Sequence, residues 1–110
     1  MNSEHVHKLD GGTWSSLERL DLSQNPWGRG GDGGVALAAA FTAWPLLRSL
    51  FLRETDMEPS ALNALLKGKS NQLEEANMSF NMLGLRGARS LAERGPGSWP
   101  NLKNLVLVYN

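Results

Sequence analysis

Three glycines stand in the pattern Gly-x-Gly-x-x-Gly, at Gly28, Gly30 and Gly33. An alternating apolar run, LERLDL, precedes them, and a helix-like run, VALAAAF, follows them. A strand, a glycine-rich turn and a helix in this order are typical of a dinucleotide-binding site. An acidic residue, Glu54, follows 21 residues after the last glycine (33 to 54), at the end of a second strand-like run. Dinucleotide binding through residues 28–33 is therefore one hypothesis for the function.

Other side chains with catalytic or metal-binding chemistry are sparse. His5 and His7 could place two imidazoles on one side of an extended chain, but no third ligand lies near them in the sequence. No Ser-His-Asp arrangement is indicated, because both histidines lie near the N-terminus. Arg29, within the glycine-rich stretch, invites comparison with a catalytic arginine finger. On balance the sequence predicts no enzyme, no catalytic residue, no metal site and no resident cofactor.

Composition narrows the class of protein. The chain has 110 residues, of which 41% are hydrophobic, as expected of one globular domain or part of one. Its 11 Lys and Arg residues balance 11 Asp and Glu residues without a basic stripe, which argues against a nucleic-acid partner. No apolar run is long enough for a membrane span, and none resembles a signal peptide. With no cysteine, these features predict a cytoplasmic protein that binds no membrane.

Four segments of the chain share one pattern of apolar residues. Each fits apolar-x-x-apolar-x-apolar-x-x-polar: LERLDLSQN from Leu17, LRSLFLRET from Leu47, LEEANMSFN from Leu73 and LKNLVLVYN from Leu102. Their starts lie 30, 26 and 29 residues apart (17 to 47, 47 to 73 and 73 to 102). A tryptophan stands three residues before the segment in three of them, at Trp14, Trp44 and Trp99, where the third has Ser70. Agreement in several columns indicates an internal repeat.

Helical spacing fills the intervals between these segments. After Pro59, which suits a first helical turn, the apolar residues Ala61, Leu62, Leu65 and Leu66 predict a helix that stops near Gly68. A second helix is predicted from Leu85, Ala88, Leu91 and Ala92, ending at Gly95, and another from Val35, Ala38 and Phe41. The stretch RGPGSWPN is expected to be a loop. Each unit therefore reads as strand, turn, helix and return.

The segments and their spacing resemble the leucine-rich repeat, L-x-x-L-x-L-x-x-N-x-L, in its ribonuclease-inhibitor-like form. That subtype also occurs in the GTPase-activating protein for Ran and in the sensor regions of NOD-like receptors. The resemblance implies an α/β solenoid, a short horseshoe arc with a parallel concave sheet and convex helices, over residues 14–110. Residues 1–13 would be a tail or the remnant of a preceding repeat. The glycines of residues 28–34 would then form an extended turn between strand and helix.

Strand alternation assigns side chains to the leucine face or to the open concave face. The residues predicted to bind a protein partner there are Arg19, Asp21, Phe51, Arg53, Glu75, Asn77, Phe80, Val106, Val108 and Tyr109. Five of these are apolar, which indicates a binding hot spot in the C-terminal half of the sheet. Two alternatives remain open. Phe80 and Tyr109 could pack into the turn, or a further repeat could cover Val106 and Val108.

Two further columns are expected to be structural. The tryptophans should pack between units and close the edge of the core. The asparagines that end three of the segments, Asn25, Asn81 and Asn110, should bond backbone groups and form a ladder between neighbouring units. Thr55 ends the remaining segment, so we expect it to break and weaken the ladder there.

The two ends of the chain lead to a further expectation. The opening HKLDGGTW resembles the tail of a repeat, AERGPGSW, and the chain ends at Asn110, the last position of a strand motif. Solenoids need polar capping units. We therefore expect a piece of a longer array that either self-associates through its uncapped ends or frays there.

The function implied by the resemblance is a non-catalytic scaffold for protein–protein interaction. It would be the partner-binding or ligand-sensing part of a larger intracellular protein, such as a NOD-like receptor of innate immunity. The alternative is a repeat-based regulator of an enzyme. That regulator would be either a GTPase activator, for which Arg29 would be the candidate residue, or an enzyme inhibitor.

Overall fold

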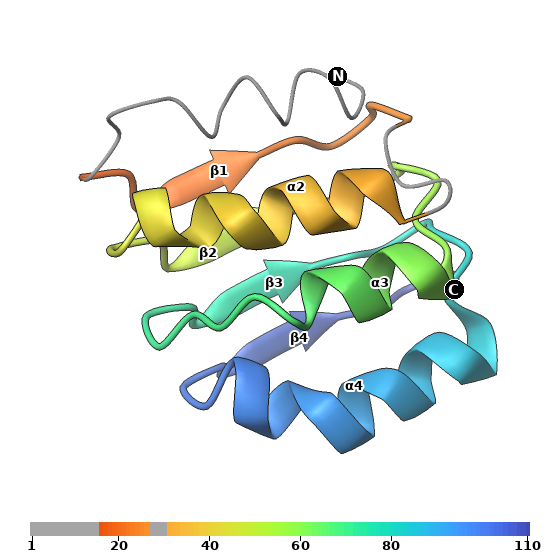
Figure 1. The fold of residues 1–110 in the computed structure, drawn as a ribbon. Coiled ribbons are helices and arrows are strands. Elements are labelled where there is room, and N and C mark those ends of the chain that lie inside the picture. The colour runs from red at the N-terminus through yellow and green to blue at the C-terminus, as the bar shows by residue number, and fades with distance from the viewer. Residues whose placement is uncertain (1–15, 27–30) are drawn as a thin grey trace.

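Four short strands alternate with helices in the computed structural model, which describes residues 16–26 and 31–110 (Figure 1). The strands are β1 (Arg19–Asp21), β2 (Ser49–Phe51), β3 (Glu75–Asn77) and β4 (Asn104–Val106). The helices are α2 (Asp32–Ala40), with the 3-10 turn η1 (Phe41–Ala43) after it, α3 (Pro59–Leu65) and α4 (Gly84–Ser98). Each strand falls inside one of the four aligned segments. We call an aligned segment and the chain up to the next segment a unit.

The strands form one sheet in the order β1-β2-β3-β4, and every neighbouring pair is parallel. The central residues of the strands, Leu20, Leu50, Ala76 and Leu105, stand side by side in register. The three helices lie along one face of this sheet and leave the other face uncovered by any helix of the described ranges (Figure 1). The predicted α/β architecture, with a parallel sheet and helices between its strands, is confirmed.

The core lies between the sheet and the helices, and period-two alternation within the strands builds it. Leu50, Leu52 and Met78 are fully buried on the helix side, while residues between them point to the open face. Trp44 and Trp99 are each only 1% exposed and belong to the same apolar cluster. This confirms their predicted place in the core; Trp14 lies outside the described residues.

Asparagines that follow the strands tie successive units together. Asn81 donates through Nδ2 to the carbonyls of Leu52 and Met78, both at 2.8 Å, so it bridges its own unit and the preceding one. Asn110 repeats this arrangement, with Nδ2 donating to Met78 O at 2.9 Å and Oδ1 accepting from Leu83 N at 3.3 Å. The predicted ladder is therefore confirmed for these two residues, whereas Asn25, within the described residues, bonds only carbonyls of its own unit.

The ladder lacks one bridge at Thr55, as predicted: among the described residues its side chain bonds its own unit and the next one, but no carbonyl of the first unit. Thr55 is fully buried, and its N–H donates to Asn81 Oδ1 at 2.9 Å. Its hydroxyl lies 3.1 Å from both Leu52 O and Asn81 Oδ1, so it can donate to either. The shorter Thr55 side chain remains in the hydrogen-bond network because Asn81 of the next unit contacts it.

The glycine-rich stretch differs from the predicted extended turn in its C-terminal half. Gly33 and Gly34 are buried in the first turn of α2, which packs against α3. A Cβ atom built on Gly34 would lie 2.2 Å from the carbonyl oxygen of Ala61, so the close approach of the two helices requires glycine there. Gly28, Arg29 and Gly30 lie outside the described residues.

The predicted apolar face of α2 is also wrong in part. Val35 is 57% exposed, and the buried face consists instead of Gly33, Gly34, Ala36, Leu37 and Ala40. Small residues are buried here because α2 lies close to its neighbours. A Cβ atom on Gly68 would lie 2.7 Å from Ala38 Cα.

Helix α4 is longer than the sequence predicts. It runs through Pro96 to Ser98, where a loop was expected after Gly95. The proline removes one N–H donor near the helix end, but tertiary contacts hold the final turn. Ser98 Oγ donates to Leu66 O, Trp99 N donates to Gly95 O at 2.8 Å, and the Trp99 ring is buried.

Of the four apolar residues predicted for the inner face of α4, only Leu91 is buried. Leu85 is 75% exposed, and Ala88 and Ala92 also face solvent. The inner face is completed by Gly87, Gly95 and Ser98, which periodicity of large apolar residues does not reveal.

Candidate functional site

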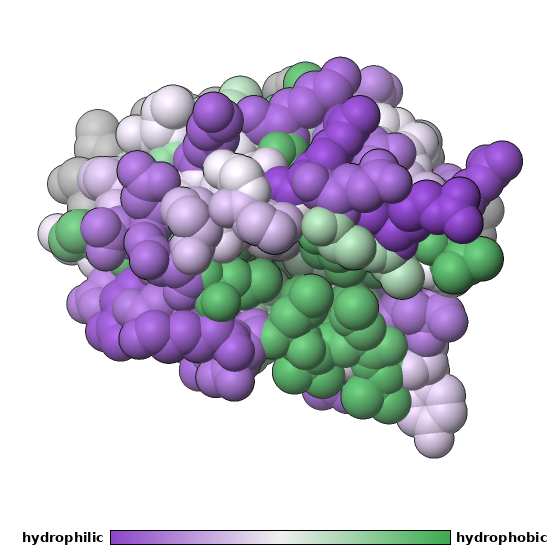
Figure 2. All heavy atoms as spheres, turned by 90° about the horizontal axis from the view of Figure 1, so that it is seen from below, coloured by the Kyte–Doolittle hydropathy of each residue, from purple (hydrophilic) through white to green (hydrophobic). Residues whose placement is uncertain are grey.

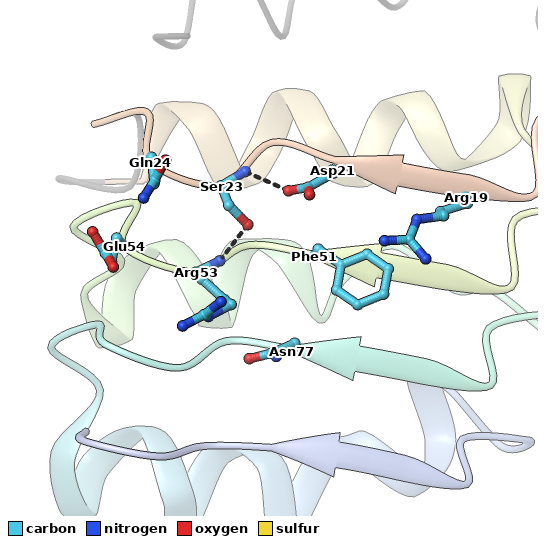
Figure 3. A pocket seen from close by; sticks show the side chains of 8 residues that line it. All are labelled: Arg19, Asp21, Ser23, Gln24, Phe51, Arg53, Glu54 and Asn77. Atoms are coloured by element: carbon cyan, nitrogen blue, oxygen red, sulfur yellow. Dashed lines mark hydrogen bonds between the residues drawn. The ribbon is translucent and has the colours of Figure 1, made fainter.

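The open face of the sheet carries a hollow of about 350 Å³ over β1, β2 and β3. It is lined by Arg19, Asp21, Ser23, Gln24, Phe51, Arg53, Glu54 and Asn77 (Figure 3). Five of these residues were predicted from the sequence to bind a partner. They gather here because alternate residues of a strand point to the same side of the sheet. The five are Arg19 and Asp21 of β1, Phe51 and Arg53 on or just after β2, and Asn77 of β3.

Guanidinium groups hold the aromatic rings of this face. The Arg19 guanidinium carbon lies 4.3 Å from the centroid of the Phe51 ring, and that of Arg53 lies 5.3 Å from the Phe80 centroid. At these distances a cation is attracted to the ring face by about 0.5–1 kcal/mol in an exposed setting. Both arginines therefore orient an aromatic ring while their charge stays in solvent.

Phe80 and Tyr109 form an exposed aromatic pair. Their rings stack at a centroid distance of 4.9 Å, and the side chains are 41% and 75% exposed. The alternative in which both rings pack into their turns is therefore wrong. Val106 and Val108 extend the apolar area, with 37% and 50% exposure.

The residue at which each strand segment turns toward its helix has a left-handed backbone. Gln24, Glu54, Phe80 and Tyr109 have φ values of 64°, 53°, 59° and 57°. None is glycine, and this conformation costs a residue with a Cβ atom roughly 1–2 kcal/mol. Two of these side chains line the hollow, and the other two form the aromatic pair. These four residues occupy one column of the aligned segments. The sequence did not indicate a positive φ there, because none of them is a glycine or an asparagine.

Asp21 is fixed as an ionised acceptor in the hollow. Hydrogen bonds from Ser23, including its N–H at 2.9 Å, lower the pKa of the Asp21 carboxyl below its ordinary value. Burial opposes this shift, and the charges of Arg19 and Arg53 add lesser lowering effects to that of the hydrogen bonds. The Ser23 hydroxyl also accepts from Arg53 N at 3.0 Å, so it links the first unit to the second (Figure 3).

The open face combines charged, polar and aromatic side chains. It offers two cations, carboxylates, amides and exposed rings, with Glu75 half-buried on β3 beside Asn104 in register. Within residues 16–26 and 31–110, no three His, Cys, Asp or Glu side chains are placed to hold a metal ion. His5 and His7 lie outside those residues.

A row of alternating charges at the amino ends of the strands escaped the sequence analysis. Glu18, Arg48, Glu74 and Lys103 occupy the second position of the four aligned segments. Arg48 lies 3.5 Å from the Glu18 carboxylate and 3.1 Å from that of Glu74, and Lys103 Nζ lies 3.3 Å from Glu74. We call these four residues the charge row. Comparing the aligned segments column by column would have revealed it.

The charge row makes stability depend on pH in acid. Lys103 and Arg48 lower the pKa of Glu74 in the folded protein. The ionised carboxylate therefore stabilises the fold fully above about pH 4.3, the ordinary pKa of a glutamate. This contribution is lost as the pH falls through the lowered pKa. We expect the loss of stability between pH 6 and pH 3, measured by urea unfolding, to be smaller in Glu74→Gln than in the wild type.

The control for this pH effect is Glu75→Gln, which changes the next residue but leaves the charge row intact. The difference between Glu74→Gln and wild type should also shrink at 1 M NaCl, because salt screens exposed charges. Equal pH dependence in the Glu74 variant and the wild type would contradict the assignment.

No protein-family model matches the chain, and no curated protein matches its sequence. None of the helices in the described ranges is long and apolar enough to cross a membrane.

Proposed function

We propose that the chain is a leucine-rich repeat solenoid and a non-catalytic scaffold that binds a protein partner on the open face of its sheet. Four segments of one pattern, a parallel sheet in sequence order, helices on one side and the asparagine ladder support this architecture. In a repeat array of this kind, the face without helices is the surface on which a partner can lie.

One observation carries the proposed function: an aromatic pair stands exposed on the face where a partner would bind. Phe80 and Tyr109 stack on one another, and the Arg53 guanidinium lies over the Phe80 ring. Aromatic and arginine side chains dominate the binding energy of protein interfaces. Because the rings are held in place before binding, little side-chain entropy is lost when a partner covers them.

The test compares two baits in a capture experiment from cytosol with mass-spectrometric readout. Phe80→Asn/Tyr109→Asn removes both rings, and asparagine accepts the left-handed backbone, so the fold should be retained. We expect the partner's retention to fall at least tenfold, the loss typical of a hot spot of about 2 kcal/mol.

The matched control is Leu85→Ser, which removes an apolar side chain that is 75% exposed on α4, away from the sheet. It should capture the same partner as the wild type, and circular dichroism should show that all three chains are equally folded. Capture that survives loss of the rings, or that is lost in the control, would place the binding surface elsewhere.

A further inference from the structure

The two outer strands leave exposed the apolar positions that the inner strands bury. Leu47, Leu50, Leu73 and Ala76 of the two inner segments are fully buried. The equivalent residues of the outer segments are not: Leu17, Leu20 and Leu102 are partly buried, and Leu105 is 38% exposed. A leucine-face residue is therefore fully buried only where a unit lies on both sides of its strand. Among the described residues, each outer strand has a neighbouring unit on one side alone.

The β4 end of the molecule is an apolar surface with a hollow. A cavity of about 260 Å³ opens there, lined by Leu91, Gly95, Pro96, Trp99, Pro100, Leu102 and Leu105. Figure 2 views the molecule from this end and shows a broad hydrophobic patch among polar surroundings. A hydrophobic patch of this kind marks a contact surface.

The backbone at this end is also arranged to accept another parallel strand. The carbonyl of Glu18 accepts N–H groups from Arg48 and Ser49, and the carbonyls of Arg48 and Glu74 each accept two from the next unit in the same way. At β4 the same position is the carbonyl of Lys103, and β4 is the outer strand of the sheet. An edge of this kind is a template for pairing with a further strand.

The charge row indicates which strand would fit. It alternates Glu18, Arg48, Glu74, Lys103, so the next position after Lys103 calls for an acidic residue. At the opposite edge, β1 pairs with β2 and with no other strand of the described ranges, and its segment carries Glu18 in this position. The two edges of the sheet therefore carry opposite charges at equivalent positions, and both expose part of the apolar residues that the inner strands bury.

We propose that the chain associates head to tail, with the β1 edge of a second copy docking in parallel on the β4 edge of the first. In the register of the existing sheet, Glu18 of the second copy lies beside Lys103, and its Leu20 beside Leu105. This places its Leu17 beside Leu102 and repeats the contact that buries the inner segments. Such a heterologous contact leaves one unpaired edge at each end of a head-to-tail dimer, so association continues beyond the dimer as concentration rises.

The test is charge exchange in the full chain, followed by sedimentation velocity over a hundredfold range of concentration. Lys103→Glu and Glu18→Lys each set like charges against one another at the contact. Each variant alone should associate about tenfold more weakly than the wild type, because an attractive cross-strand pair becomes repulsive. Mixing the two variants in equal amounts should restore association, because every contact between unlike copies then joins opposite charges.

Each variant also loses one ion pair within its own charge row, so weaker association could reflect a damaged fold. The mixture controls for this, because a damaged fold would not be repaired by mixing. Circular dichroism of each variant alone verifies the fold. Lys67→Glu changes an exposed lysine away from both edges and should associate as the wild type does. Recovery in the mixture supports head-to-tail docking. A monomeric wild type at all concentrations, a wild-type dimer that does not grow further, or a mixture that stays dissociated would overturn it.

Discussion

Replacing Gly34 with alanine is expected to lower the free energy of unfolding by about 2 kcal/mol, which is a large part of the stability of a small domain. The added methyl group would lie 2.2 Å from the carbonyl oxygen of Ala61, so α2 and α3 must move apart. The opposing carbonyl belongs to the backbone of α3 and cannot rotate away as a side chain could. Thermal unfolding should show Tm falling by roughly 10 °C.

The matched control is Gly97→Ala in α4, where an added Cβ atom meets nothing within 4 Å. Alanine favours the helix over glycine, so this variant should be as stable as the wild type or more stable by up to about 1 kcal/mol. Opposite signs for the two substitutions would show that helix contact, and not helix propensity, decides the result. Equal stability of both variants would mean that α2 and α3 are less closely packed than the structure has them.

Asn81→Ala is the second substitution with a large expected effect. The side chain is 8% exposed, and its Oδ1 accepts from Thr55 N at 2.9 Å and Met57 N at 3.0 Å. Its Nδ2 donates to Leu52 O and Met78 O. Truncation leaves these buried backbone groups without partners, each at a cost of about 1–3 kcal/mol less what local adjustment recovers. We expect a net loss of about 3 kcal/mol in chemical denaturation.

Asn25→Ala provides the comparison, because it removes the residue at the same position of the first segment. Asn25 is half-buried, and its only bonds to residues that the structure describes are to Leu22 O and Ser23 O of its own unit. Its loss should cost about 1 kcal/mol. If both substitutions cost the same, the bridging of units by Asn81 would contribute nothing beyond a local turn.

Where a feature depends on period and spacing, sequence reasoning located it correctly. Leu50 and Leu52 stand two residues apart, and this spacing recurs in the other aligned segments, so the buried face of β2 and the neighbouring strands could be assigned in advance. The same alternation placed Arg19, Asp21 and Asn77 on the open face, where the structure gathers them around one hollow. Repeated asparagines indicated the ladder because their side chains can satisfy backbone donors and acceptors together.

Features that depend on contact between elements were not predictable in this way. Val35 was assigned to the core because it is apolar, but the close packing of α2 on α3 buries Gly34 instead. Likewise α4 continues past Pro96 because Ser98 and Trp99 are anchored elsewhere, which local propensity cannot express. The aromatic pair was predicted as a hot spot, but its exposure depends on a left-handed backbone at Phe80 and Tyr109 that the residue types do not signal.

The charge row also bears on how such an array can change in length. Its signs alternate from Glu18 to Lys103, so each unit differs from the next but matches the one after it. Excising the third unit, which carries Glu74, would bring Arg48 beside Lys103 and set two cations together, whereas removing two adjacent units would preserve the alternation. A change of length by two units therefore keeps opposite charges side by side in the row, whereas a change by one unit sets like charges together.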